Sequence, residues 1–116
     1  SDAAKAVGKR LAAGRQALLD AAAFIAGGAK GSPNAVFAGS VPYLMLAGNL
    51  MAGWQMARSL IAAEDQLAAG VEPDFMRAKI TTARFYAEQL LPPALALAEN
   101  LGQMSKTVMA LDGETL

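Results

Sequence analysis

The sequence predicts an all-α fold, an antiparallel bundle of three long helices that become four if the second breaks near Pro42. Alanine supplies 27 of the 116 residues, and alanine and leucine favour helix in nearly every window. Apolar residues recur every three or four positions in three long runs. Short stretches that contain glycine and proline separate the runs. Because short loops join long helices, we expect sequential helices to lie antiparallel.

The first helix is predicted over about residues 2–29. Asp2 is a good N-cap, since its carboxylate can accept from the unpaired amides of the first turn. The stretch AKGSPN ends the helix, because Pro33 cannot continue it. One face carries the larger apolar residues, which are Val7, Leu11, Leu18 and Ile25.

The second helix is predicted over about residues 35–69, with a break at 39–42. Ser40 can cap a new helix there, and Pro42 is tolerated in its first turn. One apolar stripe comprises Leu46, Leu50, Gly53, Ala57, Leu60 and Leu67, with Tyr43, Ala47, Trp54 and Ile61 beside it. Gly48 and Gly53 each cost ~1 kcal/mol relative to alanine. Small residues at a helix crossing are favoured over space for a ligand or for the Trp54 ring.

The third helix begins near Asp74, and its apolar spacing continues through Pro92 and Pro93 to Leu111. A proline inside a helix removes a donor and clashes with the carbonyl four residues back, at a cost of ~3 kcal/mol. We therefore predict a bend at the prolines, with the helix continuing beyond them, and with the carbonyls of Glu88 and Gln89 bonded to water or side chains.

These runs make one domain, predicted over residues 1–111, followed by a short tail over residues 112–116. The expected core combines the inward positions of all three helices: Leu11, Leu18, Ile25, Leu46, Leu50, Trp54, Ile61, Met76, Ile80, Leu90, Leu97 and Leu101.

Composition excludes several classes of function. The 10 basic and 10 acidic residues cancel, so no net field attracts nucleic acid or an acidic membrane. Cysteine and histidine are both absent, which removes thiolate nucleophiles and the commonest general base and metal ligand. No charged residue occurs between Gly31 and Ala57, but prolines and polar residues interrupt this window. A buried helix in a bundle is therefore favoured over a membrane span.

No catalytic, cofactor-binding or metal-binding residue is predicted. Glu64 and Asp65 are adjacent on a helix, so their carboxylates point about 100° apart and cannot share a proton. Phe85 and Tyr86 are also adjacent and cannot face the same core, so at least one is expected to meet a second surface. The candidate packing or interface residues are Trp54, Arg58, Arg84, Phe85 and Tyr86. For Trp54 a core position is favoured over an interface anchor.

Two segments carry a family resemblance: PYLMLAGNLMAGWQMAR, residues 42–58, and AKITTARFYAEQLLP, residues 78–92. The ending ALDGETL adds to it. These segments resemble the extra C-terminal helical domain of bacterial acyl-CoA dehydrogenases, the methylthiopropanoyl-CoA dehydrogenase-like subgroup. The resemblance implies a parent flavoenzyme that uses FAD and a carboxylate base to desaturate an acyl thioester between Cα and Cβ.

The resemblance places the base and the flavin contacts in upstream domains, so this part is expected to hold no cofactor and to be non-catalytic. It would pack on the dehydrogenase core or a neighbouring subunit of a cytoplasmic, homo-oligomeric parent. The chain begins Ser1-Asp2 without an initiator methionine or a signal-peptide pattern, and we expect it to be a piece of a longer protein. The alternative is a self-contained helical interaction or adaptor protein.

Overall fold

A computed structural model describes residues 1–111 and 113–115, and these residues contain helices and no strand. The elements in chain order are α1 (Asp2–Gly28), α2 (Pro33–Ala38), α3 (Ser40–Ala68), α4 (Pro73–Phe85), a π-helical turn (Tyr86–Leu90), α5 (Leu91–Glu99), α6 (Leu101–Met109) and a 3₁₀ turn (Gly113–Thr115). The all-α prediction is confirmed. The predicted tail begins at Asp112 and ends at Leu116, and both residues lie outside the described part of the chain.

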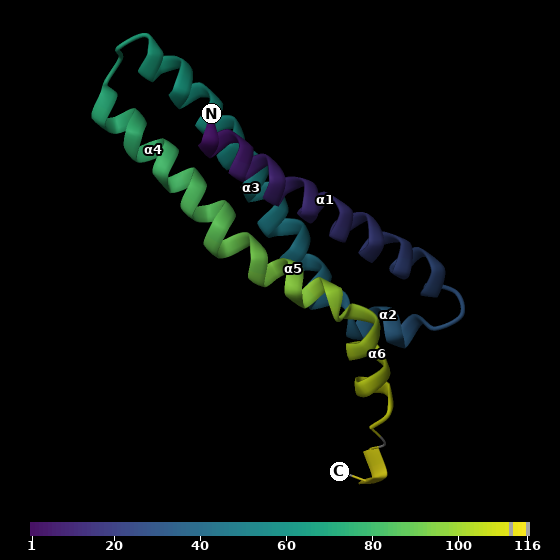
Figure 1. Ribbon diagram of the computed structural model, residues 1–116. Coiled ribbons are helices and arrows are strands. Elements are labelled where there is room, and N and C mark those ends of the chain that lie inside the picture. The colour runs from purple at the N-terminus through teal and green to yellow at the C-terminus, as the bar shows by residue number, and fades with distance from the viewer. Residues whose placement is uncertain (112, 116) are drawn as a thin grey trace.

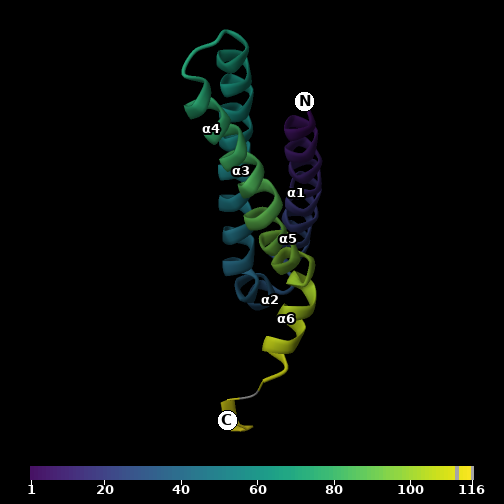
Figure 2. The ribbon, with the colours of Figure 1, turned by 60° about the vertical axis from the view of Figure 1, so that its left-hand side comes forward.

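Three rods form the bundle: α1, α3, and the continuous path through α4, the π turn and α5 (Figure 1). The end at which α3 connects to α4 extends beyond the start of α1. At the opposite end α2 and α6 pack together. Turned by 60°, the α4–α5 path runs diagonally from the side of α3 towards α1 (Figure 2). The third rod therefore packs against both of the others, with α4 on α3 and α5 on α1.

The start of α1 differs from the prediction by one residue. Ser1 is the N-cap, and its hydroxyl accepts from the Ala4 N–H at 3.1 Å. Asp2 instead lies in the first turn, where its negative charge still faces the positive end of the helix dipole. Ser1 also contacts Glu64 of α3 through its hydroxyl, which holds the beginning of α1 against α3.

The second predicted helix does break near Pro42, as the four-helix alternative states. The break is the single residue Gly39, which separates α2 from α3 and is buried. A Cβ on Gly39 would lie 3.1 Å from the Leu101 side chain, so the residue must be small for α6 to approach. Pro42 is buried in the first turn of α3, where its missing N–H has no helical acceptor.

The third predicted helix continues past Pro92 and Pro93, but a π turn takes the place of a simple kink. The Leu91 N–H donates to the Tyr86 carbonyl, five residues back, and α5 then begins with both prolines in its first turn. Prolines are tolerated there because first-turn amides lack intrahelical acceptors. The visible change of direction comes later, at Asn100 between α5 and α6 (Figure 1).

Four predicted core residues are wrong: Trp54, Ile61, Leu90 and Leu97 are 45–57% exposed. For the last two the cause is the π turn, which uses one more residue than an α turn. Leu91 is buried after it in place of Leu90, and Ala94 is buried as its predicted apolar spacing requires. Trp54 and Ile61 flank the buried stripe of α3, and the neighbouring helices do not reach far enough round to cover them.

The core consists of two clusters. One lies where the first half of α1 and the second half of α3 meet the end of α4 and the π turn: Val7, Leu60, Ala83 and Ala87. The other lies towards α6: Ala21, Leu46 and Leu101. The other predicted core residues, Leu11, Leu18, Ile25, Leu50, Met76 and Ile80, are buried or half-buried.

At positions between the two clusters, glycines allow α1 and α3 to approach each other closely. A Cβ on Gly14 would lie 2.6 Å from Leu50, and one on Gly53 would lie 3.2 Å from Leu11. Gly53 is thus at a helix crossing, as predicted. Gly48 is not, because a Cβ there would meet no atom within 4 Å.

Candidate functional site

Tyr86 joins the third rod to α3 at the crossing. Its ring lies over Gly53, where a Cβ would be 3.5 Å from the ring. The missing side chain lets the hydroxyl reach the α3 backbone, and it donates to the Asn49 carbonyl at 2.9 Å and lies 3.2 Å from Asn49 Oδ1. Burial raises the pKa of the Tyr86 hydroxyl above its ordinary value. Tyr86 is therefore a half-buried packing residue inside this chain.

Phe85 points the other way and is exposed. The structure thus separates the two adjacent aromatic residues, one towards α3 and one towards solvent. Beside them, Arg84 Nε lies 2.9 Å from Glu88 Oε1 in a partly exposed ion pair. Such a pair contributes a few tenths of a kcal/mol, on the order of 0.3–0.5. A contact between Phe85 or Arg84 and a partner stays a prediction.

Trp54 stands at the edge of a shallow apolar groove between α1 and α3. The Arg58 guanidinium carbon lies 5.4 Å from the centroid of the Trp54 ring, a cation–π arrangement along one helix. The groove has a volume of about 310 Å³ and is lined by Leu11, Ala12, Arg15, Leu50, Met51 and Trp54. The structure brings Trp54 and Arg58 together, but Arg84, Phe85 and Tyr86 belong to the third rod.

The first half of α3 has a second apolar face, directed away from the core. Val41, Leu44, Gly48 and Met51 follow one another at helical spacing, with Met45 beside them, and all five are exposed. We call these five residues the outer face of α3. Its larger members are far from covered, since Val41 and Leu44 are 67% and 68% exposed. Sequence reasoning noticed the charge-free window but assigned it to the bundle interior. Leu46 and Leu50 are one helical turn apart and define the buried side of α3. Projecting the helix from these two residues would have identified the residues on the opposite, outer side.

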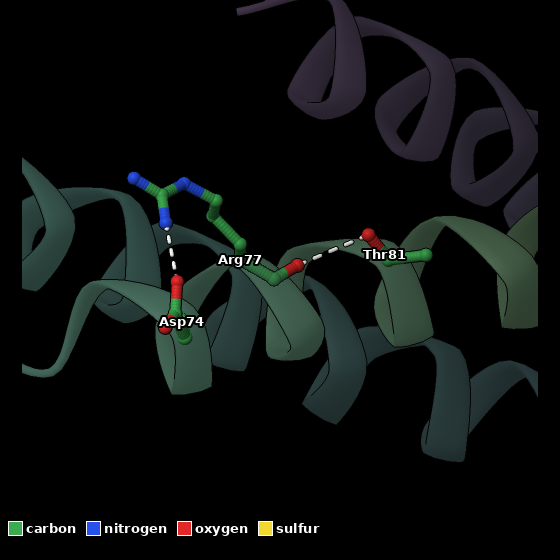
Figure 3. A network of polar contacts seen from close by, with 3 residues as sticks. All are labelled: Asp74, Arg77 and Thr81. Carbon is green, nitrogen blue, oxygen red and sulfur yellow. Dashed lines mark hydrogen bonds and ion pairs between the residues drawn. The ribbon is translucent and has the colours of Figure 1, made fainter.

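The outer side of α4 has the opposite character. Asp74 and Arg77 form an ion pair of 2.7 Å, and the Thr81 hydroxyl donates to the Arg77 carbonyl at 3.0 Å (Figure 3). Lys79 lies 5.2 Å from the centroid of the Phe75 ring. This side of the helix places charged and hydroxyl groups in water, with its exposed aromatic residues among them.

Two further hollows lie towards the α2–α6 end, with volumes of about 530 and 710 Å³. Their walls are mainly alanine, glycine and Phe24, with a few polar side chains. Among the described residues, no group of three acidic, histidine or cysteine side chains could hold a metal ion. Within residues 1–111 and 113–115, no helix is long and apolar enough to cross a membrane.

Comparison with known proteins gives a family. Residues 1–112 match the family described as acetyl-CoA dehydrogenase C-terminal like. The chain is 45% identical over 89 residues to 3-methylmercaptopropionyl-CoA dehydrogenase of Ruegeria pomeroyi. This alignment covers 77% of this chain and 15% of the relative. The chain is 35% identical over 77 residues to a broad-specificity linear acyl-CoA dehydrogenase of Mycobacterium tuberculosis, covering 64% of this chain and 13% of the relative.

No solved structure is significantly similar to the chain. The chain spans only about one seventh of the length of these relatives. Because the family match extends over nearly all of the 116 residues, the all-α bundle is the folded form of that C-terminal region. The chain belongs to the acetyl-CoA dehydrogenase C-terminal like family.

Proposed function

We propose that this chain is the non-catalytic C-terminal domain of an FAD-dependent acyl-CoA dehydrogenase, and that it stabilises or assembles the enzyme by packing on the catalytic core or on a neighbouring subunit. The observation that carries the proposal is the family match over residues 1–112. The relatives are both named as acyl-CoA dehydrogenases, and most of their length lies outside this region.

The side chains of this region support a packing role. Desaturation between Cα and Cβ needs a base to take one proton and a flavin to accept a hydride, each held by positioned polar groups. This chain has no histidine or cysteine, and Glu64 and Asp65 point apart. In this proposal FAD is held by the upstream part of the enzyme, which is cytoplasmic and homo-oligomeric. A docked helical surface contributes stability in proportion to the apolar area that it covers.

Deletion of residues 1–116 from the full-length protein tests this function. The shortened enzyme should melt at a lower temperature or change its subunit number, while its FAD content and its turnover per bound flavin stay close to those of the intact enzyme. Melting temperature, light scattering and flavin absorbance measure these properties. A deletion that leaves stability and assembly intact but abolishes turnover would contradict the proposal, as would a start codon near Ser1.

A further inference from the structure

We infer that the outer face of α3 docks on the dehydrogenase region that precedes Ser1 in the same polypeptide. This inference rests on the proposed function and specifies the surface through which the domain acts. It replaces the aromatic residues of the third rod with five residues of α3: Val41, Leu44, Met45, Gly48 and Met51.

The isolated chain exposes more surface than its size requires. Its accessible area is 7450 Å², whereas a folded monomer of 11.9 kDa exposes about 5,900 Å². The radius of gyration is 18.4 Å, against about 13 Å for a compact domain of this length. The excess of about 1,500 Å² exceeds the ~800 Å² that each partner contributes to a standard interface. The elongated chain therefore exposes enough area, summed over all of its faces, for an interface of standard size.

The outer face is an apolar part of this surface that lies in water. The first half of α3 is apolar on its inner side, through Leu46 and Leu50, and on its outer side, through Leu44 and Met51. A helix that is apolar all round is normally buried on all sides. No charged residue occurs from Gly31 to Ala57, so the outer face also lacks the charges that would deter association. The apolar groove at Trp54 adjoins this face through Met51.

Gly48 leaves room for an approaching surface, as the equally open Gly8 of α1 does. It costs ~1 kcal/mol relative to alanine in a helix interior, yet nothing in the chain approaches it within 4 Å of a Cβ position. Each glycine at a helix crossing, such as Gly53, has a neighbour that requires its small size. A backbone from outside the described residues would have room to approach closely at Gly48.

The choice of occupant follows from the length of the relatives. About 85% of the Ruegeria relative lies outside the matched region, so a large folded region is covalently joined to this domain in such a protein. A tether raises the effective concentration of two surfaces to about the millimolar range. That favours docking within one polypeptide over pairing of the same face between two copies.

Photocrosslinking in the full-length, flavin-loaded protein tests the inference. Leu44→p-benzoylphenylalanine and Met51→p-benzoylphenylalanine place the reactive group on the outer face. Phe75→p-benzoylphenylalanine, on the charged side of α4, is the matched control because Phe75 is also exposed. Positions 44 and 51 should give severalfold more crosslinked product than position 75, joined to peptides upstream of Ser1. Mixing isotopically light and heavy chains shows whether each crosslink lies within one polypeptide.

Crosslinks that join two copies through this face would overturn the choice of occupant. Yields at positions 44 and 51 no higher than at position 75 would overturn the docking face. Neither result bears on whether the parent is a dehydrogenase, since flavin content and acyl-CoA oxidation of the unmodified protein decide that separately.

A glycine pair provides a second test that does not depend on crosslinking. Gly48→Gln should lower the melting temperature of the full-length protein, because the added side chain obstructs the docked surface. Gly8→Gln is the matched control, since Gly8 lies inside α1, is exposed and has open space around it. Without docking, both substitutions should raise the melting temperature, since glutamine forms helix better than glycine. A rise at both positions would overturn the inference.

Discussion

The first half of α3 and the middle of α4 belong to the same bundle and differ mainly on their outer sides. Both bury an inner stripe, represented by Leu46 in α3 and Ala83 in α4. The outer side of α4 carries the Asp74–Arg77 pair and hydroxyl groups, whereas the outer side of α3 carries Leu44 and its neighbours. Inner packing therefore specifies the bundle, and the difference in outer composition is the basis of the proposed docking face.

The largest expected effect concerns the packing that both helices share. Leu46→Ala should destabilise the domain by about 2–5 kcal/mol, because it removes a fully buried side chain and leaves a cavity. Hydrogen exchange of the α3 amides in the full-length protein measures the loss. The matched variant is Leu44→Ala, two residues away on the outer face. If both variants lost protection equally even in a protein without upstream residues, the assignment of inner and outer sides of α3 would be incorrect.

A smaller effect separates the two outer sides. Met51→Glu in α3 should lower the melting temperature of the full-length protein by an amount equivalent to about 1–3 kcal/mol, as expected when a charge enters an apolar contact. Phe85→Glu in α4 should change it by less than about 0.5 kcal/mol, as for an ordinary surface position. Differential scanning calorimetry compares them. The reverse order would move the docking surface to the third rod.

Tyr86 connects the two regions, and Tyr86→Phe should cost about 1 kcal/mol by removing the hydrogen bond to the Asn49 carbonyl. Burial raises the pKa of the Tyr86 hydroxyl, so the folded state favours the protonated form. This stabilisation is complete below the unfolded pKa of about 10 and is lost as pH rises through the higher folded pKa.

Urea unfolding from pH 8 to pH 11 measures both parts of this prediction. The stability of Tyr86→Phe should fall less steeply above pH 10 than that of the unmodified protein. Tyr43→Phe is the control, since the Tyr43 hydroxyl makes no hydrogen bond within the described chain. A Tyr86→Phe protein with an unchanged midpoint at pH 8 would show that the hydrogen bond contributes nothing.

The smallest effect belongs to the charged side of α4. Asp74→Ala removes an ion pair between Arg77 and a fully exposed carboxylate, and the melting temperature should fall only slightly, because exposed pairs contribute little. Raising the salt concentration should erase most of this difference, because exposed charges are screened. Thermal melts at low and high salt measure both values. A salt-independent loss of stability as large as that of Tyr86→Phe would indicate that this side of α4 is covered in the complete protein.

Periodicity predicted the inner stripe of α3 correctly, because Leu46, Leu50, Gly53 and Leu60 repeat at the helical period and one face must be buried. Punctuation by Gly39 and Pro42 located the break before α3. The same reasoning placed Trp54 in the core incorrectly. The apolar face of α3 is wider than the surface that the neighbouring helices cover, and the sequence does not show which edge of that face stays exposed. That edge depends on how closely α1 approaches, which is a tertiary property.

The third rod was predicted less well. The two prolines predicted an irregular turn in this helix. The structure accommodates them by a π-type hydrogen bond from the Leu91 N–H to the Tyr86 carbonyl, which no residue pattern predicts. Leu90 and Leu97 were consequently assigned to the wrong side. The break at Asn100 has no proline or glycine at its position, and it was missed. For the candidate surface, the absence of charge was visible in the sequence, whereas its outward direction required the bundle.

The π turn has a consequence for how this family can vary in length. An additional residue in a straight helix rotates everything after it by about 100°, which would place the buried side chains of α5 in solvent. A π turn confines the extra residue to one loop of backbone, so Leu91, Ala94 and Leu101 still reach the interior. Aligned members of the family should therefore differ by a single-residue gap opposite residues 86–90, and insertions elsewhere in this rod should be rare.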